Sequence, residues 1–282
     1  MAVVGKIRKM QVHTEAQSGG SHLAHYQLPV GDEKIDMNAL IGRNIEVEHT
    51  GDINCVHCDA KTKKSFNQGY CYRCLITLAQ CDSCIIKPEL CHYSEGTCRE
   101  PEWGEQNCLS DHFVYLSNTG ALKIGITRHV TDGVSSRWID QGATQALPIL
   151  RVSERLVSGL VEHAAKAHIA DKTNWRTMLK GQPDDLDIQG RAEQVLNAIA
   201  PEIEAICAKH GIQAVQPVES DPISINYPVT QYPEKVKSIN LDKTPSFSGQ
   251  LQGIKGQYLL LDGDRVINMR KYAGYRLQVS HD

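Results

Sequence analysis

The sequence lacks the features that would place it in a membrane or outside the cell. No run of eighteen apolar residues occurs, and the first residues contain no apolar segment followed by a cleavage site. Internal repeats and low-complexity tracts are missing as well. The net charge is only −3, which gives no global electrostatic signature of a nucleic-acid or membrane partner. We therefore expect a cytoplasmic protein with no membrane partner.

The 282 residues are enough for two or three compact units. Alternating apolar and polar residues predict strands near both ends, and the middle combines cysteines with a strand–helix pattern. We predict an α+β protein in which a zinc-ribbon-like block precedes an α/β module, with β-rich flanking regions that are candidates to pack together. The predicted segments are a β-rich region (1–54), the cysteine-rich block (55–112), the α/β module (113–180), a helical segment (181–214) and a second β-rich region (215–282).

Nine of the ten cysteines lie between Cys55 and Cys108. The first four form two CxxC motifs separated by twelve residues, and these cysteines are Cys55, Cys58, Cys71 and Cys74. Two such motifs joined by a short loop bring four thiolates to one tetrahedral point, the usual arrangement of structural zinc. A ladder of disulfides is the alternative, but cysteines in a reducing compartment bind metal more often than they pair. The spacing therefore predicts a closed zinc site.

The other cysteines of the block provide ligands for one more four-coordinate ion, so we expect about two zinc ions per chain. Cys81 and Cys84 form a third CxxC motif and are predicted to supply two ligands. Two more ligands would come from four candidates: Cys91, His92, Cys98 and Cys108. A free thiol or an iron–sulfur cluster is the alternative, although cluster cysteines usually follow tighter spacings.

Positive charge is concentrated in two places. Residues 113–180 contain nine Lys and Arg against five acidic residues, a local net charge of +4. The loop between the first two CxxC motifs contains Lys61, Lys63 and Lys64, and aromatic residues follow them in the loop and in the second motif: Phe66, Tyr70 and Tyr72. Such a surface suits contact with nucleic-acid phosphates and bases, whereas the aromatic rings could equally well cover the metal. DNA or RNA is the predicted partner.

Local patterns predict the individual elements. Strands are expected at 5–12, 45–49, 112–116, 122–127, 258–261 and 265–269, with a turn at 117–120. A helix over 154–170, capped by Ser153, would pack through an apolar stripe of Leu156, Leu160, Val161 and Ala164. A second helical stretch at 191–210 is interrupted at Pro201 and stopped by Gly211.

Several short motifs follow one another in the predicted α/β module. They are Val114-Tyr115-Leu116, Lys123-Ile124-Gly125, Arg137-Trp138, Glu162 on the predicted helix, and Asn174-Trp175. In this order they resemble the GIY-YIG nuclease superfamily, and are most similar to the branch whose second motif reads KIG followed by a small hydroxylated residue, here Thr127. The resemblance covers about residues 113–180. The whole chain also resembles an uncharacterised bacterial family of unknown function, which implies no activity.

The nuclease resemblance implies a phosphodiesterase site with one divalent ion. Tyr115 would position or deprotonate the attacking water, and Lys123 would act as a base or stabilise charge. Glu162 would hold a divalent ion such as Mg²⁺. Without that role, Glu162 is half of an i,i+4 ion pair with Lys166.

Two further residues complete the site that the resemblance implies. Arg137 would bind the scissile phosphate with both ends of its guanidinium. The interval between the second motif and Arg137 is long, so Arg128 is the alternative for this role, or a contact to the nucleic-acid backbone. Asn174 would orient the phosphate or a water.

Three functions are therefore carried forward from the sequence. The leading one is metal-dependent hydrolysis of a nucleic-acid phosphodiester on a zinc-stabilised scaffold. The second is a zinc-containing protein that binds nucleic acid without cleaving it. The third is a thiol-based redox or metal sensor, for which the number of cysteines is the only support.

Overall fold

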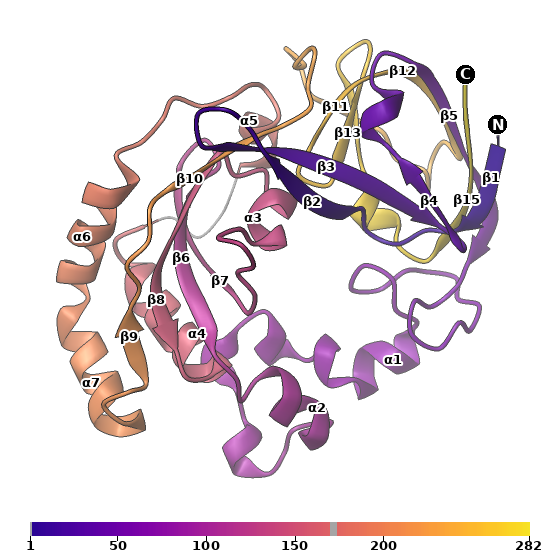
Figure 1. Cartoon of the computed structure of the whole chain (residues 1–282). Helices are drawn as coiled ribbons and strands as arrows, with labels where there is room; N and C mark the ends of the chain where they lie inside the picture. Colours follow the sequence, from indigo (N-terminus) through magenta and orange to yellow (C-terminus); the bar gives the residue numbers. More distant parts are fainter. Residues whose placement is uncertain (1, 170–173) are drawn as a thin grey trace.

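The structure is a computed structural model that describes residues 2–169 and 174–282. Two β-sheets, a layer of helices and the cysteine-rich block make up the fold (Figure 1). This confirms the predicted α+β class. The two ends of the chain lie close together in Figure 1, because the first and last strands are neighbours in one sheet.

The first sheet joins the two ends of the sequence. Its seven strands run in the order β1-β15-β5-β12-β13-β14-β11. The strand bounds are β1 Ala2–Lys6, β5 Asn44–Ile53, β11 Lys237–Ser238, β12 Ser246–Lys255, β13 Tyr258–Leu261, β14 Arg265–Asn268 and β15 Tyr275–His281. Antiparallel pairing of β15 with both β1 and β5 confirms the expectation that the β-rich ends pack together.

The second sheet carries the strands of the predicted α/β module. Its central order is β2-β3-β10-β8-β6-β7, with β4 beside β3 and β9 beside β8. The bounds are β2 Gln11–Ala16, β3 Ser21–Val30, β4 Glu33–Asp36, β6 His112–Asn118, β7 Leu122–Thr127, β8 Gln145–Val152, β9 Val215–Pro217 and β10 Ile223–Asn226. Strand β7 lies at an edge of this sheet. That edge is where the candidate site is built.

Each face of the second sheet contributes to a different core. Val114, Leu116 and Ile124 point to the helical side, where they pack with residues of α4 (Arg155–Ala165), α6 (Ile188–Ala198) and α7 (Ala200–His210). Tyr115 points to the opposite side and joins the core shared with the first sheet. Side chains alternate between faces along a strand, so successive residues of β6 serve the two cores in turn.

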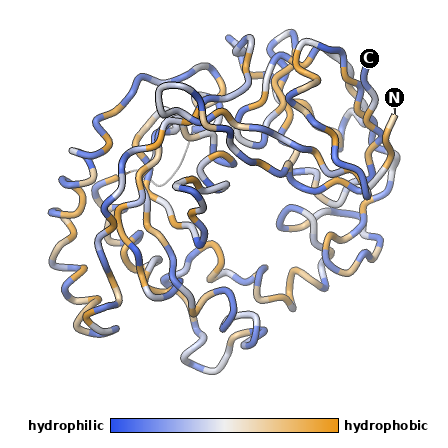
Figure 2. Tube along the Cα trace, viewed as in Figure 1, coloured by the Kyte–Doolittle hydropathy of each residue, from blue (hydrophilic) through white to orange (hydrophobic). Residues whose placement is uncertain are grey.

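The helices of the outer layer are amphipathic. In α6 and α7 hydrophobic and hydrophilic residues alternate along the trace (Figure 2), and Ile188, Ala192 and Val195 of α6 are buried against the sheet. The break between the two helices falls where Pro201 was expected to cause it, since Pro201 occupies the first turn of α7. Helix α7 ends at Gly211, which has a positive φ of 104°.

The cysteine-rich block consists of short turns of helix rather than a sheet of its own. Its elements are α1 Tyr72–Thr77, η2 Ala79–Cys81, η3 Ser83–Ile85, η4 Pro88–Leu90, η5 Tyr93–Glu95 and α2 Pro101–Asn107. In Figure 1 the block runs between the first sheet and the α/β module. Four other short helices complete the described elements: η1 Asn38–Leu40, α3 Ser136–Asp140, α5 Trp175–Met178 and η6 Met269–Tyr272.

Several local predictions differ from the structure. The expected strand at 5–12 is divided into β1 and β2 around Ile7 and Met10, whose side chains are fully buried. The central strand β8 was not predicted, because Pro148 and an apolar run hide the alternation of a strand. Pro148 is tolerated where the register between β6 and β8 shifts, next to Tyr115.

The long helix α4 also differs in its start and its buried face. It begins after Glu154, no side chain caps it, and it ends at Ala165. Ser153 instead donates its backbone N–H to Ala214. Val161 is buried as predicted, but Val157 and Gly159 are buried in place of Leu156 and Leu160. Gly159 is buried because η4 packs against it, whereas Val157 belongs to the core between the helices and the second sheet. The final residues of the predicted helix reach Ala170, which lies outside the described residues.

Among the residues that the structure describes, no helix combines the length and the hydropathy that crossing a membrane requires.

Candidate metal centre and adjacent cleft

The first four cysteines converge on one point. The sulfur atoms of Cys55, Cys58, Cys71 and Cys74 lie within 4.8 Å of one another. Sγ of Cys58 and Sγ of Cys71 are 3.8 Å apart. All except Cys58 are buried, in a small cluster with Leu78 and Tyr70. The tetrad can therefore hold one metal ion.

Backbone N–H groups are directed at these sulfurs. The N–H of Cys74 donates to Sγ of Cys71 at 3.5 Å, at the first turn of α1. Burial raises the pKa of the Cys55 thiol, but backbone N–H groups of Cys58, Cys71 and His57 outweigh it and lower that pKa to about 6. Burial raises the pKa of Cys74. Backbone N–H donors that stabilise a thiolate make the site suited to a cation.

The remaining cysteines of the block do not follow the predicted grouping. Cys81 ends η2 and packs beside the first tetrad, whereas Cys84 belongs to η3 and lines a separate cavity. Asp82 between the two turns is extended, with φ −68° and ψ 158°, so the two cysteines point to different places. The CxxC spacing predicts one turn that carries both cysteines, and it could not show that Cys81 and Cys84 lie on two separate turns.

Cys91, Cys98 and Cys108 line the same cavity as Cys84. Asp82, Cys84 and His92 form a second group whose potential ligand atoms lie within 4.8 Å of one another. From the sequence, His92 was one of four candidate ligands, whereas Asp82 was not predicted to be a ligand. This second group could also hold a metal ion.

A cleft of about 640 Å³ opens between the cysteine-rich block and the edge of the second sheet. Arg137 on α3 and Glu162 on α4 both line it, although they lie on different elements. The tetrad side contributes Val56 and Tyr70, and η4 contributes Pro88. The cleft is thus shared by the module and the cysteine-rich block.

Tyr115 lies close to Arg137. Its ring is fully buried, and its hydroxyl donates to Oε1 of Gln141 at 3.2 Å. Burial raises the pKa of Tyr115 to about 12, although Arg137 acts against it through charge and a hydrogen bond. Gly125 is the residue opposite on β7, and a Cβ there would lie 2.6 Å from the Tyr115 hydroxyl. Only glycine leaves room for this ring.

Lys123 lies on the same face of the sheet as Tyr115. The register of β6 and β7 places Lys123 opposite Ser117 and Tyr115 opposite Gly125, and residues paired across two strands share a face. Lys123 is half-buried, and its charge acts on Glu162. Lys123 therefore lies beside the cleft but is not among the residues that line it.

The carboxyl of Glu162 sits in a mixed environment. Burial raises its pKa and the Glu89 carboxylate raises it further, while Lys166, Arg137 and Lys123 lower it. Nζ of Lys166 is 3.7 Å from the Glu162 carboxylate, so the i,i+4 ion pair considered from the sequence is present. Only 15% of the Glu162 side chain is exposed. A cation bound in the cleft would stabilise the negative charge of this buried carboxylate.

Arg128 and Asn174 occupy other places. The Arg128 guanidinium donates to the side chain and backbone oxygens of Asn107 at the end of α2, so it faces the cysteine-rich block. Oδ1 of Asn174 accepts from the N–H groups of Arg176 and Thr177 and thereby caps α5. Neither residue lines the cleft.

The predicted loop lysines lie outside the cleft as well. Lys61 forms an exposed ion pair of 2.5 Å with Asp52, and Lys64 lies 5.3 Å from the centre of the Phe66 ring. Lys63 is exposed. These three lysines remain predicted contacts to nucleic acid, on a surface separate from the cleft.

Three cations of the cleft were missed in the sequence: Arg8, Lys9 and Arg270. A fourth, Arg155, was counted only as part of the basic region 113–180. Asp140 neutralises part of this charge, since its carboxylate lies 2.5 Å from Nζ of Lys9 and 3.9 Å from Arg270. Arg8 and Lys9 are remote in sequence from the module, so no local motif could have indicated them. The order of the strands brings them to the cleft.

The chain belongs to a family of proteins of unknown function, DUF2797. The family's sequence profile matches residues 42–277. The matched region contains both groups of cysteines, Arg137 and Glu162, and begins after Arg8 and Lys9. Searches of curated proteins and of solved structures gave no match.

Proposed function

We propose that this protein hydrolyses phosphodiester bonds of nucleic acid with the help of a divalent ion at Glu162. The observation that supports this most is that Arg137 and Glu162, on separate helices, line one cleft beside Tyr115. Phosphodiester hydrolysis needs a cation to stabilise the charge of the transition state and a group that activates water. Arg137 would stabilise that charge, and a divalent ion held by Glu162 would activate the water.

A zinc ion in the first tetrad would support the wall of this cleft. Four thiolates about 2.3 Å from a tetrahedral zinc are about 3.8 Å apart, and the sulfurs of Cys58 and Cys71 are separated by 3.8 Å. The ion would fix Val56 and Tyr70, which line the cleft. A closed set of four thiolates leaves no position for a reacting water, so this zinc would be structural.

Each residue in or beside the cleft has a role that its surroundings favour. Arg137 would bind the scissile phosphate, and Glu162 would hold Mg²⁺ or a similar ion. Lys123 would hold positive charge beside the carboxylate. A fully buried Tyr115 with a raised pKa is poorly suited to deprotonate water, so we assign it the positioning of Arg137 and Gln141.

The cations of the cleft also favour a second function, the binding of nucleic acid without cleavage. Arg8, Arg155 and Arg270 extend the positive surface beyond Arg137 and would contact several phosphates. Asn174, which was expected to orient the phosphate, is engaged in capping α5. Binding would need no metal at Glu162.

The two functions are separated by assays of cleavage and binding on the same variants. Wild type, Glu162→Gln, Lys123→Met, Arg137→Ala and Arg128→Ala would be incubated with supercoiled plasmid, single-stranded DNA and structured RNA, with Mg²⁺ or Mn²⁺. We expect Glu162→Gln to abolish cleavage and retain binding, and Arg137→Ala to slow turnover by about 10²-fold. Arg128→Ala is the matched control, since it removes the same charge outside the cleft.

The outcomes discriminate clearly. If Arg128→Ala slows cleavage and Arg137→Ala does not, the assignment of the phosphate-binding arginine is wrong. If wild type binds with a steep salt dependence and cuts no substrate, binding without cleavage is the function. Binding that is absent at low salt contradicts both.

A further inference from the structure

The second group of potential ligands surrounds a space for one ion. Asp82, Cys84 and His92 line a cavity of about 20 Å³, which has room for about one water-sized sphere. Their potential ligand atoms lie within 4.8 Å of one another. Three more thiols line the same cavity, those of Cys91, Cys98 and Cys108. The space and the donor atoms around it therefore have the size that a single ion needs.

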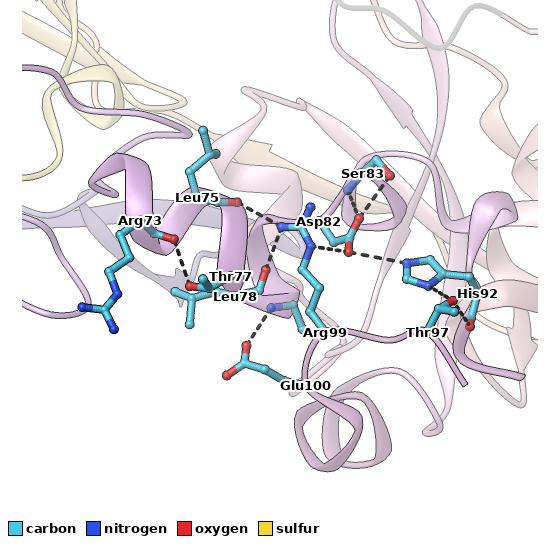
Figure 3. Close-up of polar contacts among 11 residues, drawn as sticks. Arg73, Leu75, Thr77, Leu78, Asp82, Ser83, His92, Thr97, Arg99 and Glu100 are labelled. Atoms are coloured by element: carbon cyan, nitrogen blue, oxygen red, sulfur yellow. Dashed lines mark hydrogen bonds and ion pairs between the residues drawn. The ribbon is translucent and has the colours of Figure 1, made fainter. Parts of the chain in front are cut away.

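The hydrogen bonds of Thr97 fix the tautomer of His92. The Thr97 hydroxyl donates its one proton to the backbone carbonyl of His92 at 3.2 Å. The same oxygen lies 2.7 Å from Nδ1 of His92, so it must accept there, and Nδ1 must carry the proton of that contact. In a neutral imidazole the other nitrogen, Nε2, then has a free lone pair. Figure 3 shows that this side of the ring faces Asp82.

A lone pair directed at a carboxylate needs a cation between the two acceptors. Nε2 of His92 is 3.5 Å from Oδ2 of Asp82, and only 9% of the Asp82 side chain is exposed. A charge-assisted hydrogen bond through a proton would bring these atoms to about 2.7–2.9 Å. Two ligands about 2.0–2.1 Å from a tetrahedral zinc are instead about 3.4 Å apart. The observed separation matches two ligands of one ion.

The carboxylate of Asp82 is fixed by neighbours that leave one lone pair for an ion. Nε of Arg99 is 2.7 Å from Oδ2, and Oδ1 accepts from the N–H and the hydroxyl of Ser83 at 2.5 and 3.1 Å. An ionised carboxylate oxygen has two lone pairs, so Oδ2 can bind an ion and still accept from Arg99. Carboxylate ligands of metal ions are themselves hydrogen-bonded in this way, and these bonds orient them.

Arg99 also links this group to the first tetrad. Its Nη1 donates to the carbonyl oxygens of Leu75 and Leu78 at 3.0 and 3.4 Å, at the end of α1 (Figure 3). The same helix carries Cys74 of the tetrad. Two thiolates and one carboxylate around a divalent ion leave one negative charge in excess, and the Arg99 guanidinium would offset it.

The donor atoms indicate which ion fits. A thiolate and an imidazole are ligands of transition metals, whereas Mg²⁺ and Ca²⁺ prefer oxygen. Zinc accepts Cys, His and Asp ligands in one tetrahedral site. Cys81 is not part of this set, because it packs beside the first tetrad.

We propose that Oδ2 of Asp82, Sγ of Cys84 and Nε2 of His92 bind a second zinc ion. The fourth ligand is a thiolate from the three other cysteines that line the cavity. This set replaces the pair of Cys81 and Cys84 that the CxxC spacing predicted, and it adds a carboxylate that no spacing indicated. The proposal does not depend on the function proposed for the cleft.

The first test is the zinc content of wild type and of variants, measured by native mass spectrometry after expression with added zinc. We expect about two zinc ions in wild type, and one in Cys84→Ser and in His92→Phe. The Cys81→Ser variant is the matched control, because it removes the neighbouring thiol of the same CxxC motif and should keep both ions. One zinc ion in wild type overturns the proposal. Loss of an ion from Cys81→Ser but not from His92→Phe overturns it as well.

Serine variants of the other three cysteines test the fourth ligand. One of Cys91→Ser, Cys98→Ser and Cys108→Ser should lose the second ion, and the other two should keep it. If all three keep it, a site with four protein ligands is wrong.

The second test reads the imidazole directly and needs only wild type. Long-range nitrogen–proton NMR shows which ring nitrogens of His92 carry protons. We expect a proton on Nδ1 and none on Nε2, and removal of zinc by a chelator should shift the Nε2 resonance. If both nitrogens carry protons in the zinc-loaded protein, His92 and Asp82 form an ion pair and the proposal is wrong. This result stands even if the variants do not fold.

Discussion

The cysteine-rich block contains two sets of four cysteines. Cys55, Cys58, Cys71 and Cys74 form a compact group, whereas Cys84, Cys91, Cys98 and Cys108 form a group spread around a cavity. In the first, two residues separate the members of each pair, so one turn presents both sulfurs together with N–H donors. In the second, longer intervals put every cysteine on its own turn. The comparison teaches that paired CxxC motifs bring four sulfurs within 4.8 Å of one another, whereas cysteines on separate turns do not come together in this way.

The two groups are also attached to different parts of the molecule. Next to the first tetrad, Asp59 pairs with Lys6 at 2.5 Å, and the carbonyl of Val56 accepts from Arg8 at 3.0 Å. Lys6 is the last residue of β1 in the first sheet, and Arg8 follows it closely. The second group packs on α4, where a Cβ at Gly159 would lie only 2.4 Å from the backbone nitrogen of Glu89. The cleft lies between these two attachments, so each group positions one of its walls.

The largest effect is expected from removing a cysteine of the compact group. Cys74→Ser should abolish metal binding at the tetrad, because the remaining thiolates cannot close a tetrahedral site. The loss should be about 10 kcal/mol of binding free energy. Native mass spectrometry and thermal unfolding, with Cys207→Ser as the control, would measure it. A variant that keeps a tightly bound ion at this position contradicts the closed four-thiolate site.

Acid should lower the free energy of unfolding through His112, which lies near Cys108 of the spread group. Burial lowers the pKa of His112 to about 4, although its hydrogen bond with the Ser110 carbonyl raises it. Between about pH 6.5 and pH 4, His112 is therefore protonated in the unfolded chain but neutral in the folded chain. The free energy of unfolding should fall by up to about 3 kcal/mol as the pH drops through this range.

Denaturant titrations at several pH values would measure this dependence. The His112→Phe variant removes the titrating group and should show a shallower fall in the free energy of unfolding over the same range. An equal slope in wild type and variant would mean that other groups cause the acid sensitivity.

A smaller effect should come from the contact between the spread group and α4. Alanine normally stabilises a helix relative to glycine, but Gly159→Ala would force η4 away and should cost about 1–3 kcal/mol. Metal bound by the second group should be lost before metal bound by the tetrad. Gly181→Ala is the matched control, because no atom lies within 4 Å of its Cβ position.

The smallest effect is expected at the loop of the compact group. Lys61 and Asp52 form an ion pair in which 73% and 44% of the side chains are exposed. Lys61→Ala should change the free energy of unfolding by less than about 1 kcal/mol, since solvent screens such pairs. If Lys61 contacts nucleic acid, the salt dependence of binding should become less steep. A large loss of stability would show that this loop supports the tetrad.

The sequence by itself determined much of the local structure. It gave the strands β6, β7, β13 and β14 to within two residues at their ends, the break at Pro201, and the convergence of the first four cysteines. These features depend on neighbours within a few residues, such as a CxxC turn or a proline in the first turn of a helix. The α+β class followed from the same local patterns.

Only the tertiary structure decided how these parts meet. Arg8, Lys9 and Arg270 enter the cleft because the two ends of the chain pair in one sheet, and this pairing joins residues more than 200 positions apart. Cys81 and Cys84 point to different places because Asp82 between them is extended and forms an ion pair with Arg99. Gly159 is buried because η4 docks there. Contacts between remote segments leave no periodic pattern in a single sequence, so spacing and alternation could not reveal them.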